Sequence, residues 1–137
     1  MRASFARQRV MATLGIEMIH LEPGEIHLSM LPDPAYTQQH GFMHAGIITT
    51  ALDSACGYAA FTLMPLDAAV LTVEFKTNLL VPAKGERFIF RAQVIKPGRT
   101  LTICEARALA LEGSKEKFVA TMTGTPMAVI GRQDVSH

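Results

Sequence analysis

The sequence predicts an α+β fold in which an antiparallel sheet wraps around one long, buried helix. The first observation is an apolar run over residues 38–61, in which Asp53 is the only carboxylate and no Lys or Arg occurs. A helix that is apolar on every side is normally buried. The second observation is that most of the later chain alternates between apolar and polar residues, which is typical of strands with one face on a core. A sheet that curls around the helix accounts for both patterns.

The N-terminal segment predicts a helix followed by a hairpin. Residues 3–12 form a short amphipathic pattern typical of a helix. Two runs rich in Ile, Leu and Met then flank a turn centred on Pro23-Gly24. Because Pro-Gly at the centre of a turn is a hairpin signal, we expect strands near 14–21 and 25–31.

The central helix is predicted over residues 45–64. Asp33-Pro34 ends the preceding strand, and a loop over 33–44 leads into the helix. Pro65 stops it, since the residue before a proline disfavours helical geometry. Many small side chains along this segment allow a sheet to approach closely.

The second half predicts four strands in a meander. In the first of them Leu71, Val73 and Phe75 alternate with polar residues, which predicts that this apolar face lies on the core. The predicted strands lie at 70–80, 87–96, 100–111 and 117–129. A sheet wrapped around a central helix in this way is the hot-dog arrangement, whose edge strands and apolar face are resolved by pairing of subunits.

Length and composition predict one domain over residues 1–137. Hydrophobic residues make up 49% of the chain and charged residues 18%, which favours apolar surface buried between subunits. The net charge of +1 and the lack of a basic cluster argue against nucleic acid or an anionic membrane as a partner. A membrane-spanning helix is disfavoured, since Asp53 at its centre would cost about 2.5–3.5 kcal/mol.

The cysteines predict a cytoplasmic protein. Cys56 and Cys104 lie in apolar surroundings without metal-ligand spacing, so they are interpreted as reduced core thiols. The N-terminus has scattered Arg residues and no long apolar region, which argues against a signal peptide.

Three segments carry a resemblance to a known family. They are H-G-F-M-H-A-G over 40–46 with Asp53 following on the helix, T-V-E-F-K-T-N-L-L-V-P-A over 72–83, and V-I-K-P-G-R-T over 94–100. Together they resemble the PaaI-like acyl-CoA thioesterases of the hot-dog superfamily, in the right order and over nearly the whole chain. Two positions depart from the usual pattern: Gln38 stands where the family has Asn, and Ala45 replaces the first Gly of its H-G-G motif.

The resemblance implies hydrolysis of an acyl-CoA to a carboxylic acid and free CoA. The Ala45 N–H would stabilise the oxyanion at the start of the helix, where backbone N–H groups lack partners and the helix dipole favours negative charge. The Gln38 amide would orient the thioester or water. His44 would also help to orient the reacting groups and would not transfer a proton. Asp53 would act as general base or as direct nucleophile, with Thr72 helping to hold the water beside it.

The resemblance also makes Arg99, with Lys96, a candidate for binding the coenzyme A phosphates. No metal or redox cofactor is implied, and CoA belongs to the substrate. The sequence has no glycine-rich phosphate loop, zinc spacing or Ser/His/Asp triad. His20 and His27, inside the predicted hairpin, are interpreted as packed or surface histidines.

Helix geometry adds a prediction that the motif does not state. Asp53 lies eight residues beyond Ala45, which is about 12 Å along a helix. A base must come within about 3 Å of its target, so both groups cannot reach one carbonyl from the same chain. We therefore expect a composite site across a two-fold axis, in a homodimer or a tetramer formed from two dimers.

The sequence alone leaves two other functions open. One is a hot-dog enoyl-CoA hydratase or dehydratase, although no close pair of His and carboxylate is evident at the helix start. The other is a non-catalytic module that binds acyl-CoA for regulation. A purely structural role for Asp53 also stays open, in which it caps or braces a neighbouring loop, since structural networks also hold buried carboxylates.

Overall fold

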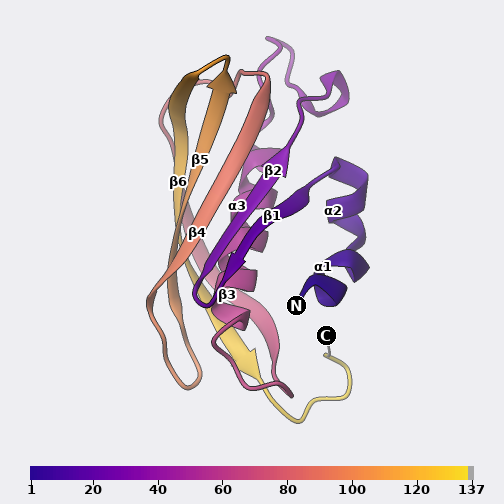
Figure 1. Cartoon of the computed structure of the whole chain (residues 1–137), viewed down its shortest axis with the longest axis vertical. Helices are drawn as coiled ribbons and strands as arrows, with labels where there is room; N and C mark the ends of the chain where they lie inside the picture. The colour runs from indigo at the N-terminus through magenta and orange to yellow at the C-terminus, as the bar shows by residue number, and fades with distance from the viewer. Residues whose placement is uncertain (136–137) are drawn as a thin grey trace.

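The computed structural model describes residues 1–135, so the last two residues of the predicted domain lie outside the described range. Its six-stranded antiparallel sheet packs on one long helix, which confirms the predicted hot-dog arrangement (Figure 1). The elements in chain order are α1 (Arg2–Arg7), α2 (Arg9–Leu14), β1 (Glu17–Glu22), β2 (Glu25–Met30), the 3₁₀ turn η1 (Pro34–Tyr36), α3 (Ala45–Phe61), β3 (Ala69–Leu79), β4 (Arg87–Lys96), β5 (Ile103–Glu112) and β6 (Lys115–Val129).

The central helix α3 ends three residues before the predicted position. The Thr62 hydroxyl donates to the Ala59 carbonyl at 2.6 Å and accepts the Gly24 N–H at 2.6 Å. This side chain therefore closes the helix and ties its end to the turn of the β1–β2 hairpin, ahead of Pro65. Within residues 1–135, no helix combines the length and apolar character that a bilayer crossing requires.

The sheet order is β1-β2-β4-β5-β6-β3, so the prediction of a four-strand meander was wrong. Strands β4, β5 and β6 do form a meander, but β3 pairs with β6 and lies at the edge of the sheet. Strand β6 is 15 residues long and pairs with β5 on one side and with all of β3 on the other. Strands that follow each other in sequence are neighbours only about two-thirds of the time, and the apolar alternation does not specify the neighbour.

The face of β3 predicted to lie on the core is exposed in the single chain. Leu71, Val73 and Phe75 are 40%, 52% and 44% exposed. Strand β3 has one neighbour only, and its pairing with β6 is interrupted by a bulge between Thr72 and Glu74. Alternation correctly identified the strand but not its inward face, since the Thr72 hydroxyl bonds Asp53 of α3 and Leu71 therefore points away from the helix.

The N-terminal segment forms two short helices rather than the single predicted one. Gln8 separates the two helices, because its backbone is extended (φ −79°, ψ 99°). Its side-chain amide donates to the Ser54 hydroxyl at 3.3 Å. The Ser4 and Tyr58 hydroxyls lie 3.2 Å apart, so these helices cover part of α3 beside β1 (Figure 1). Gly15, with φ of 67°, ends α2, and β1 therefore begins later than predicted.

Both cysteines are buried and unpaired, which confirms their interpretation as core thiols. The Cys104 thiol donates to the Cys56 carbonyl at 3.4 Å and so connects β5 to α3. Burial raises the pKa of Cys104 to about 12 and also raises the pKa of Cys56. Both groups therefore stay protonated and serve packing rather than nucleophilic chemistry.

The double role of Thr62 predicts the effect of removing its hydroxyl. Thr62→Val leaves the Gly24 N–H without its acceptor, which should lower the free energy of unfolding by about 1–3 kcal/mol. Thr62→Ser keeps the hydroxyl and should retain most of the stability. Urea unfolding of the three proteins measures the difference, and equal loss in both variants would contradict the role given to the hydroxyl.

Candidate active site

Two separate clefts hold the residues that the sequence predicts to act in catalysis. The first cleft, of about 570 Å³, lies at the start of α3 and contains Gln38, His44 and Ala45. The second cleft, of about 460 Å³, lies midway along α3 and contains Asp53 and Thr72. The single chain thus groups the expected catalytic residues into two sets, and among the described residues the two clefts have no wall residue in common.

A tight turn before α3 forms part of the wall of the first cleft. The Gly41 N–H donates to the Gln38 carbonyl at 3.0 Å, and Gly41 has a φ of 85°, a conformation that glycine adopts at little cost. The Gln38 side-chain oxygen accepts the His40 N–H. This bond fixes the amide and leaves its NH₂ end as a donor. His40 itself is exposed.

The start of α3 is organised by His44. Its Nδ1 atom accepts the Gly46 N–H at 2.9 Å, so His44 is the N-cap of the helix. A Cβ atom at position 46 would lie 3.1 Å from this nitrogen, so a larger residue there would require the His44 ring to shift. None of the described residues accepts a hydrogen bond from the Ala45 N–H. That N–H, at the positive end of the helix dipole, is available to an anionic oxygen.

Asp53 and Thr72 form the polar pair of the second cleft. The Thr72 hydroxyl donates to Asp53 Oδ1 at 2.8 Å, joining α3 to β3. Burial raises the pKa of the Asp53 carboxyl above its ordinary value, and the bond from Thr72 offsets this in part. A half-buried carboxylate with a raised pKa and one hydroxyl partner is suited to accept a proton near neutral pH.

The N-terminal helices supply walls of the second cleft that the sequence reasoning did not identify. Ser4, Arg7 and Gln8 line it together with Asp53. The only signal in the sequence was that these residues are polar within a predicted amphipathic helix. The packing of α1 and α2 against α3 is what brings them beside the Asp53 carboxylate.

Lys96 and Arg99 line neither of these two clefts. Lys96 is the last residue of β4 and Arg99 lies in the following turn, and both are exposed. The turn is held against β6, because Leu101 forms a bridge with Met127. Met127 in turn pairs with Leu71 of β3, next to Thr72.

Comparison with known proteins agrees with this architecture. Residues 40–117 match the thioesterase superfamily, which is more than half of the chain. A candidate esterase from Saccharolobus solfataricus is 31% identical over 102 residues, and the alignment spans 74% of this chain and 67% of that protein. The chain thus spans about two thirds of the length of the curated relatives that it matches.

Two solved structures extend the comparison. The crystal structure of a thioesterase family protein from Silicibacter pomeroyi has a TM-score of 0.93 and 64% identity, covering 95% of this chain and 96% of the other. PaaI from the phenylacetic acid degradation operon of E. coli has a TM-score of 0.85 and covers 95% of this chain and 91% of its own, at 20% identity, so it shares the fold. The match over residues 40–117 and these relatives show that the chain belongs to the thioesterase superfamily and has its hot-dog fold.

Proposed function

We propose that this protein is an acyl-CoA thioesterase whose active site is shared between two chains. The observation that carries the proposal is that β3 and the residues just after it run along both clefts. Residues 70–72 line the cleft of Asp53, whereas residues 79–81 line the cleft of Ala45. One exposed strand therefore connects the two half-sites of the single chain.

An antiparallel pairing of two β3 strands would join complementary half-sites. If the two-fold axis lies between Phe75 and Lys76, residues 70–72 of one chain stand opposite residues 79–81 of its partner. The cleft that holds Asp53 then meets the partner's cleft at the start of α3. This is an isologous contact, in which the same surface is used by both chains.

The character of β3 supports such a pairing. It is an 11-residue edge strand with one side of its backbone unpaired, and such an edge readily pairs with another chain. Leu71, Val73 and Phe75 on this strand are exposed, which is unfavourable unless a partner covers them. A dimer through β3 would satisfy the free backbone groups and bring these side chains beside those of the partner strand.

The joined clefts contain the groups that thioester hydrolysis requires. The Ala45 N–H stabilises the charge that develops on the carbonyl oxygen, aided by the dipole of α3. The partner's Asp53 takes the proton from the attacking water, and Thr72 holds the carboxylate in place. His44 fixes the helix start as its N-cap, and the Gln38 amide orients the thioester.

The turn that carries Arg99 lies within reach of this site. Leu101 pairs with Met127 of β6, and Met127 pairs with Leu71 of β3. Leu101 and Leu71 are therefore two strand spacings apart, about 10 Å. The guanidinium of Arg99 and the ammonium of Lys96 are exposed there and could bind the phosphates of coenzyme A while the acyl group enters the cleft.

One prediction from the proposed function concerns the Asp53 carboxylate. The wild-type protein should release free CoA thiol from members of a panel of aliphatic and aromatic acyl-CoAs. Asp53→Asn should lower kcat/KM by about 100- to 10,000-fold, because it removes the proton acceptor. Asp67→Asn removes an exposed carboxylate in the turn after α3 and should leave the rate unchanged.

The same panel separates the competing functions. Enoyl-CoA hydration without thiol release would indicate a hydratase. Binding of acyl-CoA with no turnover, unchanged in Asp53→Asn, would indicate a binding module. Either result would overturn the proposed hydrolysis.

A second prediction tests whether the site is shared. Ala45→Pro removes the N–H at the first helical position, where proline is tolerated, and His44 already has the extended conformation (φ −60°, ψ 137°) that precedes proline. Alone, Ala45→Pro and Asp53→Asn should each lose at least about 100-fold in rate. After the two variants are mixed and allowed to exchange subunits, about a quarter of wild-type activity should return, because half of the dimers are mixed and each has one intact site.

Three controls make the mixing experiment decisive. Asp53→Asn mixed with the double variant that carries both changes cannot form an intact site and should stay inactive. Ala45→Val adds bulk but keeps the N–H, so it should retain more activity than Ala45→Pro. Native mass spectrometry verifies that mixed dimers form; mixed dimers without recovered activity would refute the shared site.

A third prediction concerns the hydroxyl beside the carboxylate. Thr72→Val should lower kcat/KM roughly 10- to 100-fold, since a hydrogen bond to a charged group is lost. The bond from Thr72 lowers the Asp53 pKa, so its loss raises that pKa and should move the acidic limb of the pH profile to higher pH. Thr72→Ser keeps the hydroxyl and should keep the wild-type profile; a Thr72→Val profile that superimposes on wild type would exclude this role.

A further inference from the structure

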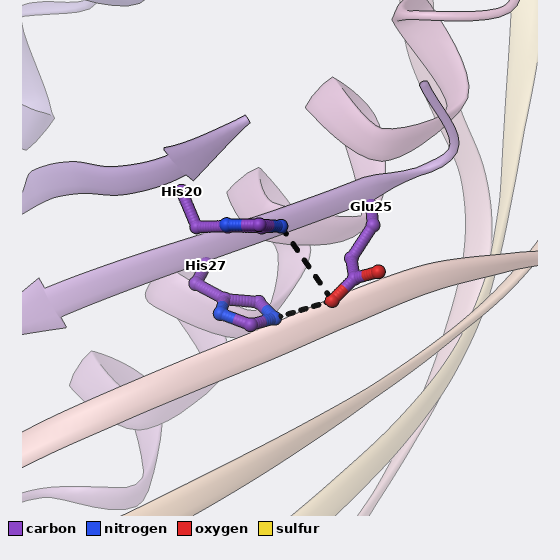
Figure 2. Close-up of side chains that lie close together, drawn as sticks. All are labelled: His20, Glu25 and His27. Carbon is purple, nitrogen blue, oxygen red and sulfur yellow. Dashed lines mark hydrogen bonds and ion pairs between the residues drawn. The ribbon is translucent and has the colours of Figure 1, made fainter. Parts of the chain in front are cut away.

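We propose that His20, Glu25 and His27 bind one divalent transition-metal ion, with Zn²⁺ as the best match. The three side chains lie together on the hairpin formed by β1 and β2 (Figure 2). Ile26 and Leu28 of β2 are fully buried on the helix side of the sheet. Since strand residues alternate between faces, Glu25 and His27 lie on the outer face, where an ion can enter.

Strand register brings the two histidines together. His20 and His27 are directly paired across the hairpin, and Glu25 lies two residues before His27 and so projects from the same face. His27 Nε2 lies 2.8 Å from Glu25 Oε1, and His20 Nε2 lies 3.8 Å from the same oxygen. The candidate ligand atoms of the three residues are all within 4.8 Å of one another, and Figure 2 shows both rings directed toward the carboxylate.

His20 has an unsatisfied nitrogen that points to a missing ligand. Its ring is one-third exposed, with 33% of the side chain accessible, but the Nε2 atom itself is covered. Among the described residues this atom has no hydrogen-bond partner. The nearest carboxylate oxygens, on Glu22 and Glu25, are 3.5 and 3.8 Å away, at or beyond the limit of a hydrogen bond. A cation placed between the nitrogen and Glu25 would satisfy both.

The donor set matches zinc in type and number. Two imidazole nitrogens and one carboxylate form a common three-residue zinc site, with bonds of about 2.0–2.2 Å. Tetrahedral geometry at these bond lengths places ligand atoms about 3.3 Å apart, within the range of separations found here. The rings are stacked with centroids 4.4 Å apart and planes 29° apart, so they need to tilt toward the ion on binding.

The surrounding charges are compatible with a cation. Glu22 adds a second carboxylate next to His20. Arg91 of β4 pairs in register with His27 and brings a positive charge close to it, which the Glu116 carboxylate, 3.4 Å from the guanidinium, offsets only in part. Gln93, opposite Glu25 on β4, is uncharged.

A bound ion would hold the edge strand β1 to its neighbour β2. Strand β1 pairs only with β2, and a bulge interrupts this pairing between Met18 and His20. Ligands from both strands would fix β1 at that point. Because β1 and β3 lie at opposite ends of the sheet, this site is separate from the proposed active site, and either proposal can fail without the other.

Zinc titration of the metal-stripped protein tests the proposal. Isothermal titration calorimetry at neutral pH should show one equivalent of Zn²⁺ per chain, and thermal unfolding should shift to higher temperature with zinc, because the ion binds the folded state. His20→Gln, His27→Gln and Glu25→Gln should each weaken binding by more than about 100-fold, the upper end of the loss found for outer-shell partners. Mg²⁺, which prefers oxygen ligands, should neither bind with this affinity nor shift the unfolding.

His40→Gln provides the matched control, since His40 is exposed and lies outside the cluster. It should bind zinc as the wild type does. Without zinc, all variants should unfold at temperatures close to wild type, which shows that they are folded. No binding by the wild type, or equal binding by the variant with both His20 and His27 replaced, would overturn the proposal.

Discussion

The constraint on which the proposed site depends is that the apolar helix α3 keeps one carboxylate half-buried. Asp53 lies on a helix that packs against five of the six strands, and Thr72 is its one hydrogen-bond partner among the described residues. Burial disfavours its charged form, which is a cost to folding at neutral pH. The helix cannot turn this residue away without exposing its apolar neighbours. The same packing that buries the core therefore holds the carboxylate against β3, at the wall of a cleft.

Strand β3 gives the single chain an incomplete surface. It carries Thr72 at one end and borders the start of α3 at the other, and its middle exposes Val73 and Phe75. An edge of this length is a liability in a monomer and an asset in a symmetric dimer. Pairing through β3 would remove the exposed edge and complete the catalytic geometry at once. On this view stability of the assembly and activity are coupled through one strand.

Most of the fold was predictable from the sequence, because most helices and strands have a local sequence signal. The apolar run over residues 38–61 predicted the buried helix, and Pro23-Gly24 predicted the first hairpin. Strand neighbours were harder to predict, since alternation gives the face of a strand but not its partner. The meander was therefore misassigned at β3, and the end of α3 was misplaced because Thr62 acts through a contact with distant Gly24.

For the sites, the residue types were predictable from the sequence, whereas the folded chain shows which of these residues lie together. The motif identified Ala45 and Asp53, and helix rise alone separated them by about 12 Å. Only the fold showed that they open into two clefts joined by β3. His20 and His27 have no metal-ligand spacing along the chain, and strand register alone makes them neighbours. Local order follows from short-range sterics and hydrophobic pattern, whereas a site assembled across strands depends on pairing that no short segment encodes.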